Sequence, residues 1–185
     1  MTQQSAPIRE DSLAHDGSGT TSWDLASERL ANPEFQRTSW LATTRRDGRP
    51  HLMPVIGSWI DGSLYLIAGE GSQKGRNLAA DDRCVIATTS TTLPSIDIVL
   101  EGRAVAITDG EEVGRLAETF TSSGWPLEAE GDKVRGPHAP TAGPPPYTIY
   151  RIVPSKGFGL PGMLGMDTYE PSELPKPTRW TFGDG

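Results

Sequence analysis

The sequence predicts a mainly β fold, in which six short antiparallel strands close into a small barrel that carries two or more short helices. Three observations favour this class. Asp47-Gly48 and Asp61-Gly62 each separate two apolar runs, which is the pattern of a tight hairpin turn. The 21 glycines and 16 prolines among 185 residues indicate many turns. The repeated strand–helix units of a doubly wound parallel sheet are not seen in the pattern.

The chain is expected to divide into a tail and one domain. Residues 1–20 are rich in Ser, Thr, Gln, Gly and Asp, and we expect them to form a disordered tail. Residues 21–185 are expected to form a single barrel domain. It begins with a helix over 23–31 that Ser22 can cap. This helix is expected to end at Asn32-Pro33, because the residue before a proline avoids the α region.

Alternating apolar and polar residues place the barrel strands. They are expected at residues 38–44, 49–60, 63–68, 84–89, 96–108 and 147–153. Gly102, within the fifth strand, predicts a bulge or a sharp bend of the kind that a barrel corner needs. After an irregular segment, residues 178–182 alternate like a short edge strand.

Two further helices are expected between the strands. One begins near Gln73, and the other follows Asp109, which can cap it, and ends at Gly124. One face of the second helix is expected to pack on the barrel, because four apolar residues recur at helical spacing: Val113, Leu116, Ala117 and Phe120. Residues 125–146 are rich in Pro and Gly and are expected to form an ordered surface loop.

Composition limits the classes of partner and of site. The net charge of −7 makes nucleic acid and anionic membranes poor partners. A single cysteine, Cys84, excludes a disulfide within the chain and a paired-cysteine metal site, and its apolar surroundings indicate a buried thiol. The three histidines lack metal-ligand spacing. No segment resembles a signal peptide or a membrane helix, so a cytoplasmic protein is expected.

The segment from Gly69 to Leu78, GEGSQKGRNL, is the best candidate for a binding site. Ser72 offers a hydroxyl, Lys74 a point charge and Arg76 a fork of donors, all beside an expected helix N-terminus, which together suit a phosphate. The alternative is a solvated loop with two ordinary surface cations, since the P-loop pattern is absent. No catalytic triad order or nucleophile elbow is visible, which fits a protein whose bound cofactor supplies the chemistry.

The order of these motifs resembles the split β-barrel family of flavin and deazaflavin oxidoreductases related to pyridoxamine 5′-phosphate oxidase. The resemblance covers residues 28–120 well and 147–182 loosely. The motifs that carry it are Leu41-Ala42-Thr43, Asp47-Gly48, Arg49 to Val55, Asp61-Gly62, Leu64-Tyr65-Leu66, Ser72 with Lys74, Asn77-Leu78, Asp82-Arg83 and Glu101 to Ala104.

The resemblance implies a homodimer with the cofactor in a groove between the subunits. It places Ser72 and Lys74 on the cofactor phosphate, with Arg76 and Asn77 alongside. The resemblance also implies that Met53, Pro54 and Val55 contact the tricyclic ring, and that Ile67, Ala68 and Gly69 lie beside the ribityl chain. Trp180 is a further implied contact. It lies in a C-terminal segment that looks like the ending of the deazaflavin-binding branch. Arg45, Arg46 and Arg49 could meet the acidic glutamyl tail of a deazaflavin.

The function implied by the resemblance is transfer of hydride from a reduced deazaflavin, coenzyme F420, to a small organic acceptor. Two alternatives stay open: an FMN-dependent oxidase or reductase, and a non-catalytic carrier of flavin or haem, in which haem would need an axial ligand such as His51. The substrate-phosphate residues of a true pyridoxamine phosphate oxidase are not recognisable, which disfavours vitamin B6 synthesis. The acceptor pocket is expected to come from residues 121–146 and 154–177.

Overall fold

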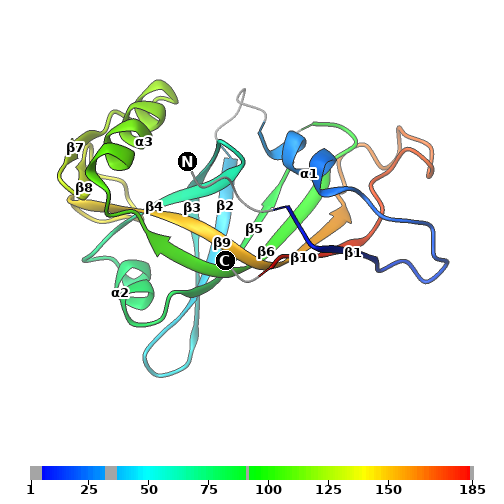
Figure 1. The fold of residues 1–185 in the computed structure, drawn as a ribbon, viewed down its shortest axis with the longest axis horizontal. Coiled ribbons are helices and arrows are strands. Elements are labelled where there is room, and N and C mark those ends of the chain that lie inside the picture. Colours follow the sequence, from blue (N-terminus) through cyan, green and yellow to red (C-terminus); the bar gives the residue numbers. More distant parts are fainter. Residues whose placement is uncertain (1–5, 32–36, 91, 184–185) are drawn as a thin grey trace.

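The computed structural model describes residues 6–31, 37–90 and 92–183 (Figure 1). Within these residues the chain forms ten strands and three short helices. In chain order they are β1 (Arg9–Ser12), α1 (Trp23–Leu30), β2 (Arg37–Thr44), β3 (Pro50–Ile60), β4 (Ser63–Gly69), α2 (Gln73–Ala80), β5 (Arg83–Thr89), β6 (Ile96–Ala106), α3 (Gly110–Ser122), β7 (Glu128–Glu130), β8 (Lys133–Arg135), β9 (Tyr147–Pro161) and β10 (Thr178–Thr181).

Six of the strands close into an antiparallel barrel, which confirms the predicted fold. The order around the barrel is β9, β4, β3, β2, β5 and β6, and β6 pairs with β9 again. The register of β6 against β9 shifts between Glu101 and Gly102, so the predicted bulge is present. A Cβ atom on Gly102 would lie 2.1 Å from the carbonyl oxygen of Val153, so only glycine allows the strands to approach so closely there.

Two hydrophobic clusters hold the barrel and its helices together. The first fills the barrel and includes α1, whose Trp23 ring lies 5.2 Å from the ring of Trp180 and 5.0 Å from that of Phe182. The second lies between the opposite face of β4 and β9 and the apolar face of α3, as predicted. Figure 1 shows α1 at one end of the barrel and α3, with β7 and β8, at the other.

The helices begin where the sequence indicates. Ser22 accepts a hydrogen bond from the N–H of Leu25 at the start of α1, and Asp109 accepts one from Glu112 at the start of α3. Gly124, just beyond α3, has a φ of +96°, a conformation that glycine adopts without strain. The predicted stop at Asn32-Pro33 lies outside the described residues. No helix in the described part of the chain is long and apolar enough to span a membrane.

The structure differs from the predictions in three segments. Residues 9–12 form β1 against β10, so the expectation of a disordered tail is wrong there; the Glu10 carboxylate also accepts from the N–H of Trp23 at 2.8 Å. Residues 128–135 form the β7–β8 hairpin within the expected loop. Strand β9 continues to Pro161, because its second half pairs with both β6 and β10.

Candidate anion-binding site around helix α2

Helix α2 begins at a turn that Ser72 locks. The Ser72 hydroxyl accepts a hydrogen bond from the N–H of Gly75 at 3.1 Å and donates one to the carbonyl oxygen of Gly69 at 2.7 Å. A Cβ atom on Gly75 would lie 2.2 Å from that same carbonyl oxygen, so the helix sits directly against the end of β4. Ser72 is therefore the N-cap of α2, and its hydroxyl is engaged by the backbone.

Lys74 points into the protein. Only 2% of its surface is exposed, and its Nζ donates to the carbonyl oxygen of Thr141 at 2.6 Å. Burial lowers the pKa of this ammonium group. The segment around Thr141 closes over the end of β4, since a Cβ atom on Gly69 would lie 2.2 Å from the carbonyl oxygen of Ala142. The structure thus holds Lys74 beneath this segment rather than on an open surface.

Asn77 connects α2 to the barrel. Its side chain is buried, its Nδ2 donates to the Thr43 hydroxyl at 2.9 Å, and its Oδ1 accepts from Gln73 at 2.7 Å. His51 lies on the neighbouring strand, with its Nδ1 3.5 Å from the same hydroxyl. Burial, and then the charges of Arg45 and Lys74, lower the pKa of His51, so its neutral form is favoured.

An open hollow of about 540 Å³ lies between α2 and the turn that joins β2 to β3. We call it the arginine hollow; its charged lining is Arg45, Arg46, Asp47, Arg49 and Arg76. Four arginines against one aspartate leave three positive charges in excess, although the chain as a whole is acidic. An anion is therefore attracted to this hollow more strongly than to the average surface.

The guanidinium groups of the hollow are engaged to different degrees. Arg49 pairs with Asp47 at 2.8 Å and holds the pKa of that carboxyl below its ordinary value. Arg76 donates to the carbonyl of Gly71 at the helix start. The guanidinium groups of Arg45 and Arg46 make no hydrogen bond or salt bridge to any residue that the structure describes. The hollow therefore offers donors that an incoming anion can use without breaking an existing contact.

The other residues proposed to contact a cofactor are mostly buried. Ile67, Ala68 and Gly69 are buried on β4, and on β3 Val55 is buried while Met53 and Pro54 are partly exposed. The structure therefore leaves Met53 and Pro54 as the members of this set with accessible side chains.

Trp180, also proposed to contact a cofactor, lies in the core of the chain. Its side chain is fully buried, and its Nε1 donates to the carbonyl oxygen of Thr21 at 3.1 Å. A Cβ atom on Gly159 of the opposing strand β9 would lie 2.3 Å from the Trp180 ring. Glycine is therefore needed at position 159, because the indole fills the space that a side chain would occupy. Trp180 is thus a core residue in this structure, and no face of its ring is open to a cofactor.

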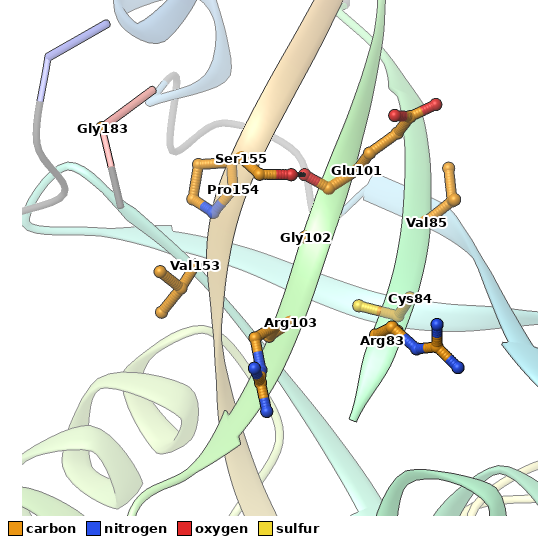
Figure 2. Close-up of a pocket in the computed structure, with 10 residues that line it drawn as sticks. All are labelled: Arg83, Cys84, Val85, Glu101, Gly102, Arg103, Val153, Pro154, Ser155 and Gly183. Carbon is orange, nitrogen blue, oxygen red and sulfur yellow. Dashed lines mark hydrogen bonds between the residues drawn. The ribbon is translucent and has the colours of Figure 1, made fainter. Parts of the chain in front are cut away.

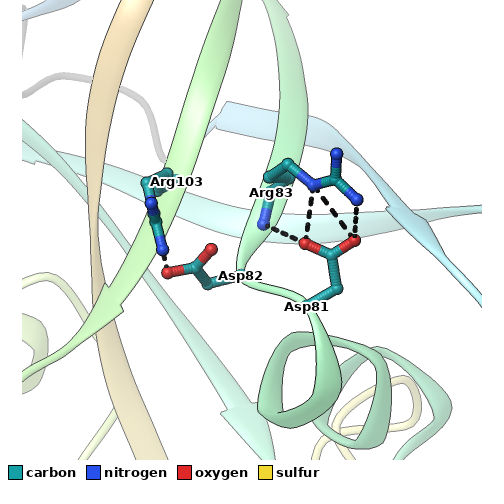
Figure 3. Close-up of polar contacts among 4 residues, drawn as sticks. All are labelled: Asp81, Asp82, Arg83 and Arg103. Carbon is teal, nitrogen blue, oxygen red and sulfur yellow. Dashed lines mark hydrogen bonds and ion pairs between the residues drawn. The ribbon is translucent and has the colours of Figure 1, made fainter.

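A second hollow, of about 630 Å³, lies across β5, β6 and β9 (Figure 2). Its two arginines already form ion pairs with neighbouring aspartates (Figure 3). Arg83 pairs with Asp81 at 2.7 Å, which lowers the pKa of Asp81 to about 2, and Arg103 pairs with Asp82 at 2.9 Å. Burial raises the pKa of Cys84 to about 12, so the thiol is unreactive near neutral pH, as its apolar surroundings predict.

Sequence analysis missed the residues of the β7–β8 hairpin. Lys133, on β8, forms a salt bridge with Glu70 at 2.8 Å, directly beside the start of α2. Strand β8 is three residues long and is flanked by Gly131-Asp132 and Gly136-Pro137, so no periodic signal marks it. The described residues contain no group of three or more His, Cys, Asp or Glu side chains that could hold a metal ion.

Comparisons with known proteins agree with the barrel. Solved structures of similar fold include a conserved hypothetical protein from Mycobacterium tuberculosis (20% identity, 88% of this chain and 96% of that chain, TM-score 0.56) and a putative pyridoxamine 5′-phosphate oxidase from Listeria innocua (16%, 75% and 98%, 0.54). A FAD-binding protein from Mesorhizobium loti is also similar (18%, 88% and 97%, 0.51). No curated protein matches. The family model described as pyridoxamine 5′-phosphate oxidase matches residues 28–157, and the chain therefore belongs to this family.

Proposed function

We propose that the protein is an oxidoreductase that uses reduced coenzyme F420 to reduce a small organic acceptor. The arginine hollow is the observation that carries the proposal. Its three excess positive charges and its volume of about 540 Å³ suit a ligand with several negative groups. FMN carries one phosphate, whereas the deazaflavin adds an acidic glutamyl tail, so a surplus of cations favours the deazaflavin.

The residues of the hollow fit the anionic part of such a cofactor. Arg45 and Arg46 supply guanidinium groups that the described part of the chain does not occupy. Arg76 adds a further positive charge in the first turn of α2, where its guanidinium also donates to the Gly71 carbonyl. The helix N-terminus contributes its partial positive charge. When bound, the cofactor supplies the hydride; the protein's part in the proposal is to bind the anionic tail and to orient the ring.

Lys74 has a supporting role in this proposal. Its ammonium is held by Thr141. Its charge also acts through space, since it adds to burial and to Arg45 in lowering the pKa of His51. Ser72 and Asn77 likewise fix the helix rather than offering free groups. In this proposal the arginines of the β2–β3 turn therefore bind the anion, and the motif on α2 supports the site.

We further propose that a second copy of the chain covers the outer face of the barrel sheet. One row of register neighbours crosses this face: Pro54, Trp40, Ala87, Val99 and Phe158. Trp40 is 48% exposed, and Leu52, in the next row, is 57% exposed. The solvated face of an antiparallel sheet is normally polar, so an apolar row of this length favours a partner.

A titration with each cofactor tests the proposal. The purified protein is titrated with coenzyme F420 and, separately, with FMN, and binding is followed by fluorescence. The expected result is tighter binding of F420, with an affinity that falls as salt is raised, because the proposed contacts are exposed charges. Preference for FMN would transfer the protein to the FMN-dependent class, and a Soret band with haem in the absence of flavin binding would favour a carrier.

Sedimentation velocity tests the proposed dimer. The wild type is expected to sediment as a dimer, and Trp40→Glu as a monomer, because the change places a charge within the apolar row. Ser122→Glu is the matched control, since it adds the same charge at an exposed residue at the end of α3, outside this face. A wild-type monomer, or a dimer that Trp40→Glu leaves intact, would contradict the proposed interface.

A further inference from the structure

A third hollow, of about 490 Å³, lies on the other side of α2 from the arginine hollow. We call it the β8 pocket, because strand β8 supplies its central cation, Lys133. The pocket is bounded by α2, by the ends of β6 and β9, and by Glu70, which follows β4. Its polar residues on β8 and β9, which are Lys133, Thr148 and Tyr150, lie outside every motif described above.

A chain of four polar side chains forms one wall of the β8 pocket. Lys133 Nζ lies 2.8 Å from the Glu70 carboxylate and donates to the Thr148 hydroxyl at 3.0 Å. Tyr150 in turn interacts with Thr148 by a side-chain hydrogen bond. The contact with Glu70 raises the pKa of Lys133, and burial raises the pKa of Tyr150. Lys133 is therefore cationic and Tyr150 remains a phenol at neutral pH.

Another part of the lining is apolar. It is formed by Leu78 on α2 and by Ala104, Val105 and Ala106 at the end of β6. The lining also contains Arg76, which the pocket shares with the arginine hollow and which donates to the carbonyl of Gly71. The one further carboxylate in the lining, Asp82, is already bound to Arg103 at 2.9 Å (Figure 3). A ligand in this pocket therefore meets both an apolar surface and a polar wall with a fixed cation.

The two members of the Lys133–Glu70 pair are held differently. The Lys133 side chain is 27% exposed and has a second partner in Thr148, so its position is fixed. The Glu70 side chain is 62% exposed, and among the described residues it forms an ion pair with Lys133 alone. Exposed ion pairs add little stability, so Glu70 can leave Lys133 at small cost. The cation is thus permanent and the anion is replaceable.

From this asymmetry we propose that the β8 pocket binds a small organic carboxylate with an apolar body. The ligand carboxylate takes the place of Glu70 on Lys133, and the apolar body covers Leu78 and Val105. An amine ligand would have to use Glu70, which the structure leaves exposed and weakly positioned, so the carboxylate is the better match. This inference goes beyond the proposed function and does not depend on a cofactor in the arginine hollow.

Titration of the cofactor-free full chain with benzoate, followed by ligand-observed NMR, tests the inference. Benzoate is the probe because it combines one carboxylate with a flat apolar body, and binding in the millimolar range is expected for so small a ligand. Lys133→Gln is expected to weaken binding about tenfold or more, since it removes a charge-assisted contact. Glu70→Gln is expected to strengthen binding severalfold, because it removes the competing carboxylate.

Two further variants keep the result interpretable. Tyr150→Phe is expected to weaken binding by a smaller factor than Lys133→Gln, because its phenol reaches the carboxylate site through Thr148. Arg135→Gln is the matched control on the same strand: Arg135 pairs with Glu130 and lies outside the pocket, so the affinity for benzoate is expected to stay unchanged. Absence of benzoate binding, or Glu70→Gln binding no more tightly than the wild type, would overturn the proposal. Either outcome leaves the F420 titration unaffected.

Discussion

The basic residues on the two sides of the α2 N-terminus use their charges in different ways. Lys74 is buried, and its Nζ is bound to the carbonyl of Thr141; Asn77, one turn later, uses both ends of its amide. Arg45 and Arg46 extend into an open hollow, where their guanidinium groups have no hydrogen-bond or salt-bridge partner among the described residues. A cation near a helix start is therefore a candidate binding residue only when its donors are still available.

The largest effect on stability is expected at Trp180, which is fully buried in the core. Trp180→Ala is expected to lower the free energy of unfolding by about 3–5 kcal/mol, because it leaves a large cavity among Trp23, Phe182 and the glycines of β9. Denaturant unfolding measures the change. Trp180→Phe serves as a milder variant: if it kept full stability but lost cofactor affinity, Trp180 would return to the cofactor site.

Replacement of Lys74 tests the comparison directly. Lys74→Ala is expected to cost about 2–4 kcal/mol of unfolding free energy, since it removes a fully buried side chain and leaves the Thr141 carbonyl without its donor. Arg46→Ala, the matched loss of a cation from the open side, is expected to change stability by less than about 0.5 kcal/mol. If both variants were equally stable in urea and only Lys74→Ala lost F420 binding, the assignment of Lys74 to the structure and of the arginines to anion binding would be wrong.

The open side is expected to affect affinity rather than stability. Arg46→Gln is predicted to weaken F420 binding by about tenfold, the value of one charge-assisted contact of about 1.4 kcal/mol. FMN binding is expected to change less, because FMN lacks the acidic tail. Fluorescence titration measures both affinities, with Arg135→Gln on β8 as the control for a general loss of positive charge. An equal loss of affinity for F420 and for FMN would mean that Arg46 does not contact the glutamyl tail.

The barrel could be predicted because its signals are local. Asp47-Gly48 and Asp61-Gly62 mark hairpins between neighbouring strands, and apolar alternation marks the strands themselves. Strand β1 could not be predicted, since its four residues are polar and its partner, β10, lies more than 160 residues away. The β7–β8 hairpin was missed because each strand is three residues long.

The candidate site could be predicted only in part. The start of α2 and its Ser72 cap follow from residues close together in the sequence. The burial of Lys74 depends on Thr141, which is 67 residues away, and the charge of Lys133 meets Glu70 only because the β7–β8 hairpin folds back. Sequence patterns identify which groups can bind an anion, whereas the tertiary contacts decide which of them remain available.

The smallest expected effect is a pH dependence of stability that comes from the buried Lys74 and not from the exposed arginines. Burial lowers the pKa of Lys74 below its ordinary value of 10.5 in the folded protein. Between the folded pKa and 10.5 the unfolded chain binds more protons than the folded one, so this group makes stability rise with pH in that window. Below the window both states are charged, and the folded protein bears the full cost of burying the ammonium.

Lys74→Met removes this titration while it keeps most of the side-chain volume. The unfolding free energy of the wild type, minus that of Lys74→Met, is therefore expected to increase as the pH rises towards 10.5 and to level off above it. Urea unfolding of both proteins at a series of alkaline pH values measures the difference, and the subtraction removes the titration of Tyr150 and other groups common to both. A difference that stays constant with pH would show that the ammonium keeps its hydration, and Lys74 would then belong with the arginines on the open side of the helix.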